Sequence, residues 1–174
     1  MFLTQTKPTL IMKKFRFCLL ASLLLQVSIS AFAVGLPAKI DTAFQKMYPQ
    51  ATNVEWSQMA GCYVAEFMMD NQEIDVWYSN DADWVMTETD VESLEKVPAP
   101  VAEAFMESQM AGMRLRDVRI ITFPKHPTVI VLEVEQYNSE EEFQLFYAPD
   151  GTLLQSLDVT ELGGEIYPGL FFND

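Results

Sequence analysis

The chain has one histidine and two cysteines in 174 residues, and this scarcity excludes several kinds of site. His126 and Cys62 together fall short of the four ligands of a structural zinc site. No Gly-x-Ser-x-Gly motif is present to hold a serine nucleophile. The seven glycines are scattered and show neither Rossmann nor P-loop spacing, so the common nucleotide-binding motifs are excluded.

Basic residues are also few, because 11 Lys and Arg stand against 25 Asp and Glu and leave a net charge of −14. Nucleic acids and anionic membranes bind basic surfaces, so neither is an expected partner. The acidity is compatible with a cationic partner, a divalent cation, or solubility alone. Asn80, Asp81 and Asp83 share one turn and offer oxygen ligands, but the turn lacks the glycine and distal glutamate of an EF-hand. We expect no cofactor, and we keep a small-ligand or calcium carrier as an alternative.

Residues 1–33 have the layout of a cleaved export signal. Three basic residues precede an apolar run at 17–27, which is shorter than the ~18 residues of a spanning helix. A small-x-small site follows at Ala31-Phe32-Ala33, so we predict cleavage after Ala33. The remaining chain, 34–174, has no predicted transmembrane segment.

The predicted mature chain is strongly acidic and has one cysteine. Four of the 11 basic residues and none of the acidic residues lie in the signal, so 7 basic and 25 acidic residues remain. A chain of this length is long enough to bury one hydrophobic core and needs no disulfide bonds for stability. Cys62 cannot form an intramolecular disulfide, and we expect it to be a small buried hydrophobe.

Two stretches of the chain resemble each other. Leu36-Pro37-Ala38 returns as Val97-Pro98-Ala99, and Tyr78 and Asp81 return as Tyr147 and Asp150. Two copies of one unit predict a single pseudo-symmetric domain, since neither copy buries its apolar face alone. We place the copies at about 36–91 and 97–159, followed by a C-terminal tail at 160–174.

Each copy begins with a helical pattern and continues with strand patterns. Ile40, Ala43, Phe44 and Met47 follow the spacing of one helix face. Short polar turns then separate segments of alternating pattern, which favours an antiparallel meander. The predicted fold class is α+β, with two helices on one face of an eight-stranded antiparallel sheet. We expect the strands at about 53–58, 63–69, 73–78, 84–88, 116–123, 128–137, 141–147 and 152–157.

Alternation along these strands predicts which side chains point away from the helices. Ile74, Val76 and Tyr78 point toward the helices, so their neighbours point outward. The open face is therefore expected to be acidic, with Trp77 and Phe146 exposed among carboxylates. The candidate partner-binding residues are Glu66, Glu73, Asp75, Trp77, Glu133, Glu135, Glu142 and Phe146.

Carboxylates in pairs also occur in glycosidases, where burial separates their pKa values. A flat, open sheet face provides no such burial. We therefore expect no enzymatic activity.

Three stretches resemble the PepSY-like, beta-lactamase-inhibitor-protein-like domains exported by Bacteroides-type bacteria. They are the Leu-Pro-Ala helix start at 36–38, Tyr48-Pro49-Gln50-Ala51 with Val54-Glu55-Trp56, and the segment from Phe146 to Leu154. The resemblance spans about 36–159. It implies a tandem-repeat sheet flanked by helices, a periplasmic or surface location in a Gram-negative bacterium, and binding or inhibition of another protein.

The leading hypothesis is thus an exported, non-enzymatic module that binds a protein of the cell envelope through its open face. An inhibitor or regulator of an exported peptidase or hydrolase is the second, with the loops Ser79–Asp83 and Pro124–Pro127 entering a cleft. The tail contains several aromatic residues, which either dock on the sheet or bind a partner. The partner and the oligomeric state stay open.

Overall fold

The structure, a computed structural model, describes residues 35–172. Two helices, two short 3-10 helices and eight strands follow one another along this part of the chain. Their order is α2 (Ala38–Met47), β1 (Glu55–Met59), β2 (Cys62–Met69), β3 (Gln72–Tyr78), β4 (Trp84–Asp90), η1 (Leu94–Lys96), α3 (Ala99–Glu107), β5 (Arg114–Thr122), β6 (Val129–Glu135), β7 (Glu142–Tyr147), β8 (Leu153–Asp158) and η2 (Pro168–Leu170).

The eight strands form one antiparallel sheet in which every strand pairs with its neighbours in sequence. Tight turns permit this order. Asp70 and Asn71 both have positive φ, 54° and 60°, as a two-residue hairpin between β2 and β3 requires. Gly151 takes the same region between β7 and β8. The predicted α+β class and antiparallel sheet are confirmed, and each predicted strand overlaps an observed one. The internal duplication stays a prediction.

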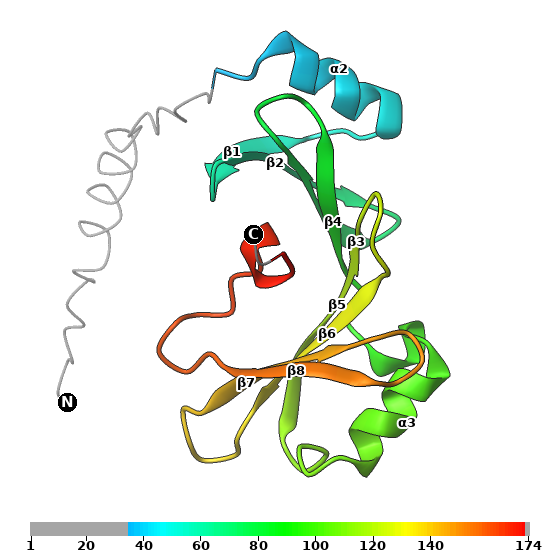
Figure 1. Ribbon diagram of the computed structural model, residues 1–174, viewed down its shortest axis with the longest axis vertical. Helices are drawn as coiled ribbons and strands as arrows, with labels where there is room; N and C mark the ends of the chain where they lie inside the picture. Colours follow the sequence, from blue (N-terminus) through cyan, green and yellow to red (C-terminus); the bar gives the residue numbers. More distant parts are fainter. Residues whose placement is uncertain (1–34, 173–174) are drawn as a thin grey trace, which may run out of the picture. The chain divides into compact units, whose positions relative to one another are not determined.

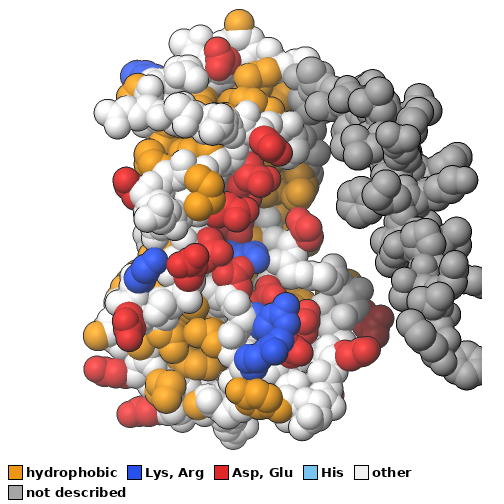
Figure 2. Space-filling model, turned by 180° about the vertical axis from the view of Figure 1, so that it is seen from behind, with side chains coloured by type: hydrophobic (Ala, Val, Ile, Leu, Met, Phe, Trp, Pro, Cys, Tyr) orange, Lys and Arg blue, Asp and Glu red, His pale blue; other side chains and the backbone are white. Residues whose placement is uncertain are grey.

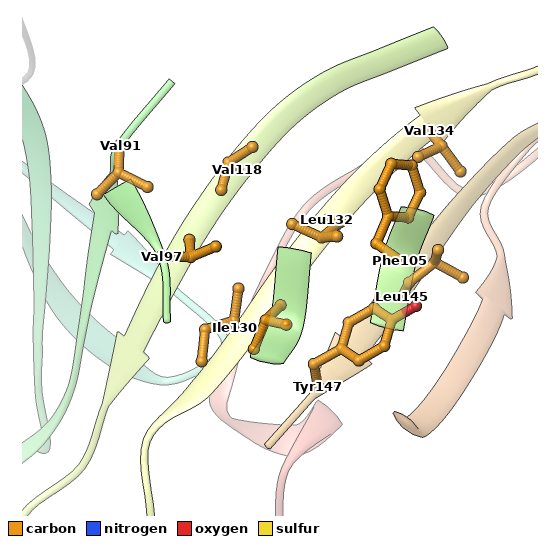
Figure 3. Close-up of a cluster of buried hydrophobic side chains, with 10 residues drawn as sticks. Val91, Val97, Phe105, Val118, Ile130, Leu132, Val134, Leu145 and Tyr147 are labelled. Atoms are coloured by element: carbon orange, nitrogen blue, oxygen red, sulfur yellow. The ribbon is translucent and has the colours of Figure 1, made fainter. Parts of the chain in front are cut away.

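Helix α3 covers the second half of the sheet. Its Val101 and Phe105 are buried against Val118, Leu132 and Leu145, which are cross-strand partners on β5, β6 and β7. Figure 3 shows this cluster, in which Phe105 lies beside Val134, and Tyr147 belongs to the same cluster. Burial of such side chains from water is the main source of the fold's stability.

Helix α2 covers the first half on the same sheet face. Ile40 and Phe44 are fully buried against Phe67, Val76 and Tyr78. The register that joins Phe67 through Ile74 and Ile120 to Tyr147 shows that both helices lie on one face. We call the opposite side the outer face.

The outer face is not bare. Residues 160–172, here called the C-terminal segment, cross it, and Figure 1 shows this segment, in red, on the side opposite α3. Ile166, Phe171 and Phe172 join a third buried cluster there. Of the two alternatives that the sequence leaves open for the tail, the structure shows docking on the sheet.

This docking corrects the expected exposure of the two outer aromatic residues. Trp77 and Phe146 do point away from the helices, yet each is only 2% exposed. Both lie in the cluster that the C-terminal segment covers. The alternation therefore assigned their face correctly, and the proposed exposure was wrong because the tail supplies a third layer.

The predicted signal, 1–33, lies outside the described residues. Within residues 35–172, neither helix combines the length and the hydropathy of a membrane span. Cys62 is free and half-buried, and burial raises the pKa of its thiol.

Candidate functional site

Four carboxylates stand in one row across the first half of the outer face. The pairing register places Glu55 opposite Glu66, Glu66 opposite Asp75, and Asp75 opposite Glu88. Like charges directly opposite each other destabilise a sheet. Packing of the inner face must offset this cost, so the row is not explained by folding stability.

The row borders a cavity of about 410 Å³ on the outer face. We call this cavity the acidic basin. Arg119 is the only basic residue that lines it within the described part of the chain. Figure 2 shows acidic side chains gathered in a band, with few basic side chains among them. The carboxylates that line the basin are Glu66, Glu73, Asp75, Glu88, Asp90, Asp117, Glu133 and Glu165.

Arg119 holds together the side of the basin nearest β5. Its guanidinium lies 3.2 Å from Glu88 Oε1 and also pairs with Asp117 on its own strand. The side chains of Arg119 and Glu88 are 23% and 13% exposed. Arg119 thus neutralises only part of the carboxylate charge, and the net charge of the basin is strongly negative.

Burial is the main reason that the pKa values of three carboxyl groups in the basin, those of Asp75, Glu88 and Asp90, are raised. Burial, with further contributions from Glu66 and Glu73, raises the pKa of Asp75 to about 6. Burial raises the pKa of Glu88 to about 8, and Arg119 only partly opposes the rise. The expectation that this face leaves its carboxylates fully hydrated was wrong, because Asp75 and Glu88 are largely buried in the basin.

The predicted site residues fall into two groups. Glu66, Glu73, Asp75, Trp77 and Glu133 all line the basin. The other three do not line it. Glu135 instead accepts hydrogen bonds from Arg114 at 2.5 Å and Arg116 at 2.7 Å, Glu142 is half-buried beside it on β7, and Phe146 lies in the buried cluster.

The prediction missed five charged residues of the basin: Glu88, Asp90, Asp117, Arg119 and Glu165. Extending the alternation of β3 through the register to β4 and β5 places the first four on the outer face. Glu165 gives no such signal, because the C-terminal segment has no strand period.

The basin and the acidic turn differ from metal centres. In residues 35–172, no three His, Cys, Asp or Glu side chains are arranged to hold a metal ion. Asp81, from the turn considered for calcium, instead lies 3.3 Å from Lys39 Nζ.

Comparison with known proteins relates the chain to one family. Residues 61–155 match the family model described as "Putative beta-lactamase-inhibitor-like, PepSY-like". No curated protein matches the chain.

Three solved structures share the fold. A DUF2874 family protein from Bacteroides ovatus is 36% identical, with a TM-score of 0.76 over 79% of this chain and 97% of that one. A BLIP-like protein from Bacteroides fragilis is 37% identical, with a TM-score of 0.70 over 76% and 94%. A protein from Bacteroides eggerthii described as "putative periplasmic" is 34% identical, with a TM-score of 0.71 over 77% and 94%.

Proposed function

Because the chain belongs to the PepSY-like, beta-lactamase-inhibitor-like family, we propose that it is a non-enzymatic module that binds another protein through its outer face. The acidic basin is the proposed contact surface, and the partner presents a basic patch to it. The observation that carries this proposal is the row of acidic side chains Glu55, Glu66, Asp75 and Glu88, which borders the basin. A basic partner offsets the electrostatic repulsion between these neighbouring carboxylates. Such charge complementarity favours both specificity and rapid association.

Five of the predicted contact residues line the acidic basin, but they differ in how far a partner can reach them. Glu66 and Glu73 are exposed and available to a partner, whereas Asp75 and Glu133 are half-buried. Trp77 lies beneath the basin and is proposed to shape its floor. Glu135, Glu142 and Phe146 are kept only as a proposed margin of the interface.

Variants in which glutamates are replaced by uncharged glutamines test this function. The double variant Glu66→Gln/Glu73→Gln removes two exposed charges from the basin without removing packed apolar groups. A matched control, Glu103→Gln/Glu107→Gln, removes the same charge from exposed positions at α3. Affinity capture from a cell-envelope extract should return a protein that binds wild type and the control but not the basin variant. Identical captured proteins for all three would contradict the proposal.

An inhibitor of an exported hydrolase is the second candidate, and the turn at Ser79–Asp83 favours it. The backbone N–H of Ser79 donates to Asp83 O at 2.9 Å, and that of Ala82 donates to Ser79 O at 3.0 Å. A loop held in shape by its own hydrogen bonds loses little entropy on binding. A panel of exported peptidases and beta-lactamases assayed with micromolar protein tests this candidate, and undiminished rates throughout would exclude it.

We also propose export to the periplasm or cell surface, after cleavage at Ala33. The family relation and the described periplasmic relative support this location. The equivalent burial of Tyr78 and Tyr147, on the third strand of each half, supports the proposed duplication. N-terminal sequencing of the protein purified from a periplasmic fraction tests the cleavage site.

A further inference from the structure

The C-terminal segment is attached to the outer face mainly by apolar side chains. Ile166 is 3% exposed, within the cluster that contains Trp77 and Phe146. The ring of Phe171 lies 5.0 Å from that of Phe123 and 5.7 Å from that of Phe146, centroid to centroid. The segment therefore occupies the middle of the face that the proposed function needs.

Its polar attachment is concentrated at one backbone group. The carbonyl oxygen of Gly164 accepts hydrogen bonds from Gln144 Nε2 at 2.7 Å and from Arg119 at 3.3 Å. A Cβ on Gly164 would meet only the Glu133 carboxylate, the flexible end of a side chain that can shift to make room. Backbone contacts of this kind depend little on sequence, so another peptide segment with an extended backbone can make them as well.

The C-terminal segment leaves the face incompletely satisfied. The indole N–H of Trp77, a residue 98% removed from solvent, has no acceptor in the described chain, and Asp75 Oδ1 has no donor. Both residues line the acidic basin, which the C-terminal segment borders without filling. Buried polar groups without partners cost free energy, and a better-matched occupant would recover it.

The charge of the segment is also unfavourable at this place. Glu165 adds a carboxylate to the basin and contributes to the raised pKa values of both Asp75 and Glu88. A second cavity, of about 360 Å³, lies along the other side of the segment, between Phe146, Leu154 and Phe172. The segment thus lies between two unfilled cavities, and its Glu165 carboxylate repels the carboxylates of the acidic basin.

From these observations we infer that the C-terminal segment is a displaceable occupant of the outer face, which competes with a basic peptide segment of the partner. This inference rests on the proposed function. Arginine or lysine side chains match the carboxylates of the basin, and a peptide carbonyl matches the unpaired Trp77 N–H. Displacement of the segment uncovers Trp77, so the competing peptide gains both kinds of contact.

Competition reduces the apparent affinity of the peptide by the fraction of molecules with the segment displaced. Loosening the segment must therefore strengthen peptide binding. Ile166→Ala removes its central buried side chain, whereas Leu162→Ala removes a side chain of the same segment that is 79% exposed. Gln144→Met removes the donor to Gly164 O and loosens the segment independently.

The probe is the peptide acetyl-Gly-Arg-Gly-Arg-Gly-amide, with its citrulline counterpart as the uncharged control, titrated by calorimetry at low salt. We expect Ile166→Ala and Gln144→Met to bind the arginine peptide at least tenfold more tightly than wild type, and Leu162→Ala to bind like wild type. Saturating peptide should also speed hydrogen exchange of the Leu170 and Phe171 amides, which donate within the segment.

Unchanged or weaker binding by both loosened variants would overturn the inference. If wild type still prefers arginine over citrulline in that case, and Glu66→Gln/Glu73→Gln abolishes the preference, the proposed function stands alone. Failure of every variant to bind the arginine peptide would overturn the proposed basic partner and the competition together. Faster exchange of the segment without tighter binding by the loosened variants would contradict competition.

Discussion

Replacing Glu88 by glutamine should flatten the pH dependence of stability. The ordinary pKa of 4.5 applies in the unfolded chain, and the folded chain raises it to about 8 because Glu88 is buried. Between these pH values the folded state holds a proton that the unfolded state has released. The free energy of unfolding of the wild type therefore falls as pH rises through this window, and the contribution is fully present only below pH 4.5.

The size of the effect follows from the same values. At about 1.4 kcal/mol for each pH unit, the rise from 4.5 to about 8 corresponds to roughly 5 kcal/mol when Glu88 is ionised. Glutamine has the shape of the protonated acid and does not titrate. We expect Glu88→Gln to match wild type within about 1 kcal/mol at pH 4.5 and to exceed it by several kcal/mol at pH 9.

Urea denaturation at pH 4.5, 7 and 9 measures these differences, with Glu103→Gln on α3 as the control for loss of one exposed charge. The control should stay within about 0.5 kcal/mol of wild type at each pH. Parallel stability curves for wild type and Glu88→Gln would refute the reasoning, because they would show that Glu88 has the same proton affinity in both states.

Three further perturbations test the packing and the charge arrangement by urea denaturation. Leu132→Ala in the α3 cluster should cost about 2–5 kcal/mol, whereas Leu153→Ala, 50% exposed on β8, should cost under about 1 kcal/mol; equal losses would contradict the assigned core. Gly151→Ala should destabilise by more than about 1 kcal/mol, because its φ is 88° and a Cβ would meet backbone, while Gly112→Ala has open space and should be near neutral. Arg119→Leu should cost roughly 3 kcal/mol at pH 9 and less at pH 5, where Glu88, whose pKa is about 8, holds a proton; a loss independent of pH would count against the ion-pair network.

Sequence periodicity was sufficient for most of the fold. The apolar positions Ile40 and Phe44 repeat at helical spacing, and the alternation through Ile74, Val76 and Tyr78 places one strand face against the helices. Both patterns are formed by residues that are close in sequence, so they can be recognised without knowledge of the tertiary structure. The strand boundaries moved by at most two residues, because short polar turns mark them.

The candidate site was only partly predictable, for a physical reason. Alternation assigns a face to Glu66, Asp75 and Trp77, but the exposure of that face depends on whatever else packs on it. The C-terminal segment has no period, so nothing in its sequence placed Ile166 over Trp77. Burial of the aromatics and the raised pKa of Glu88 arise from this long-range docking, which local patterns do not encode.

The most direct test of the acidic basin as a binding surface is a map of amide chemical-shift changes in ¹⁵N-labelled protein on addition of the arginine peptide. The account predicts that the largest changes lie on β2, β3 and β4 around Glu66 and Asp75, with further changes in the C-terminal segment, and that the citrulline peptide produces none of them. Changes centred on α2 and α3, or equal changes with both peptides, would contradict it.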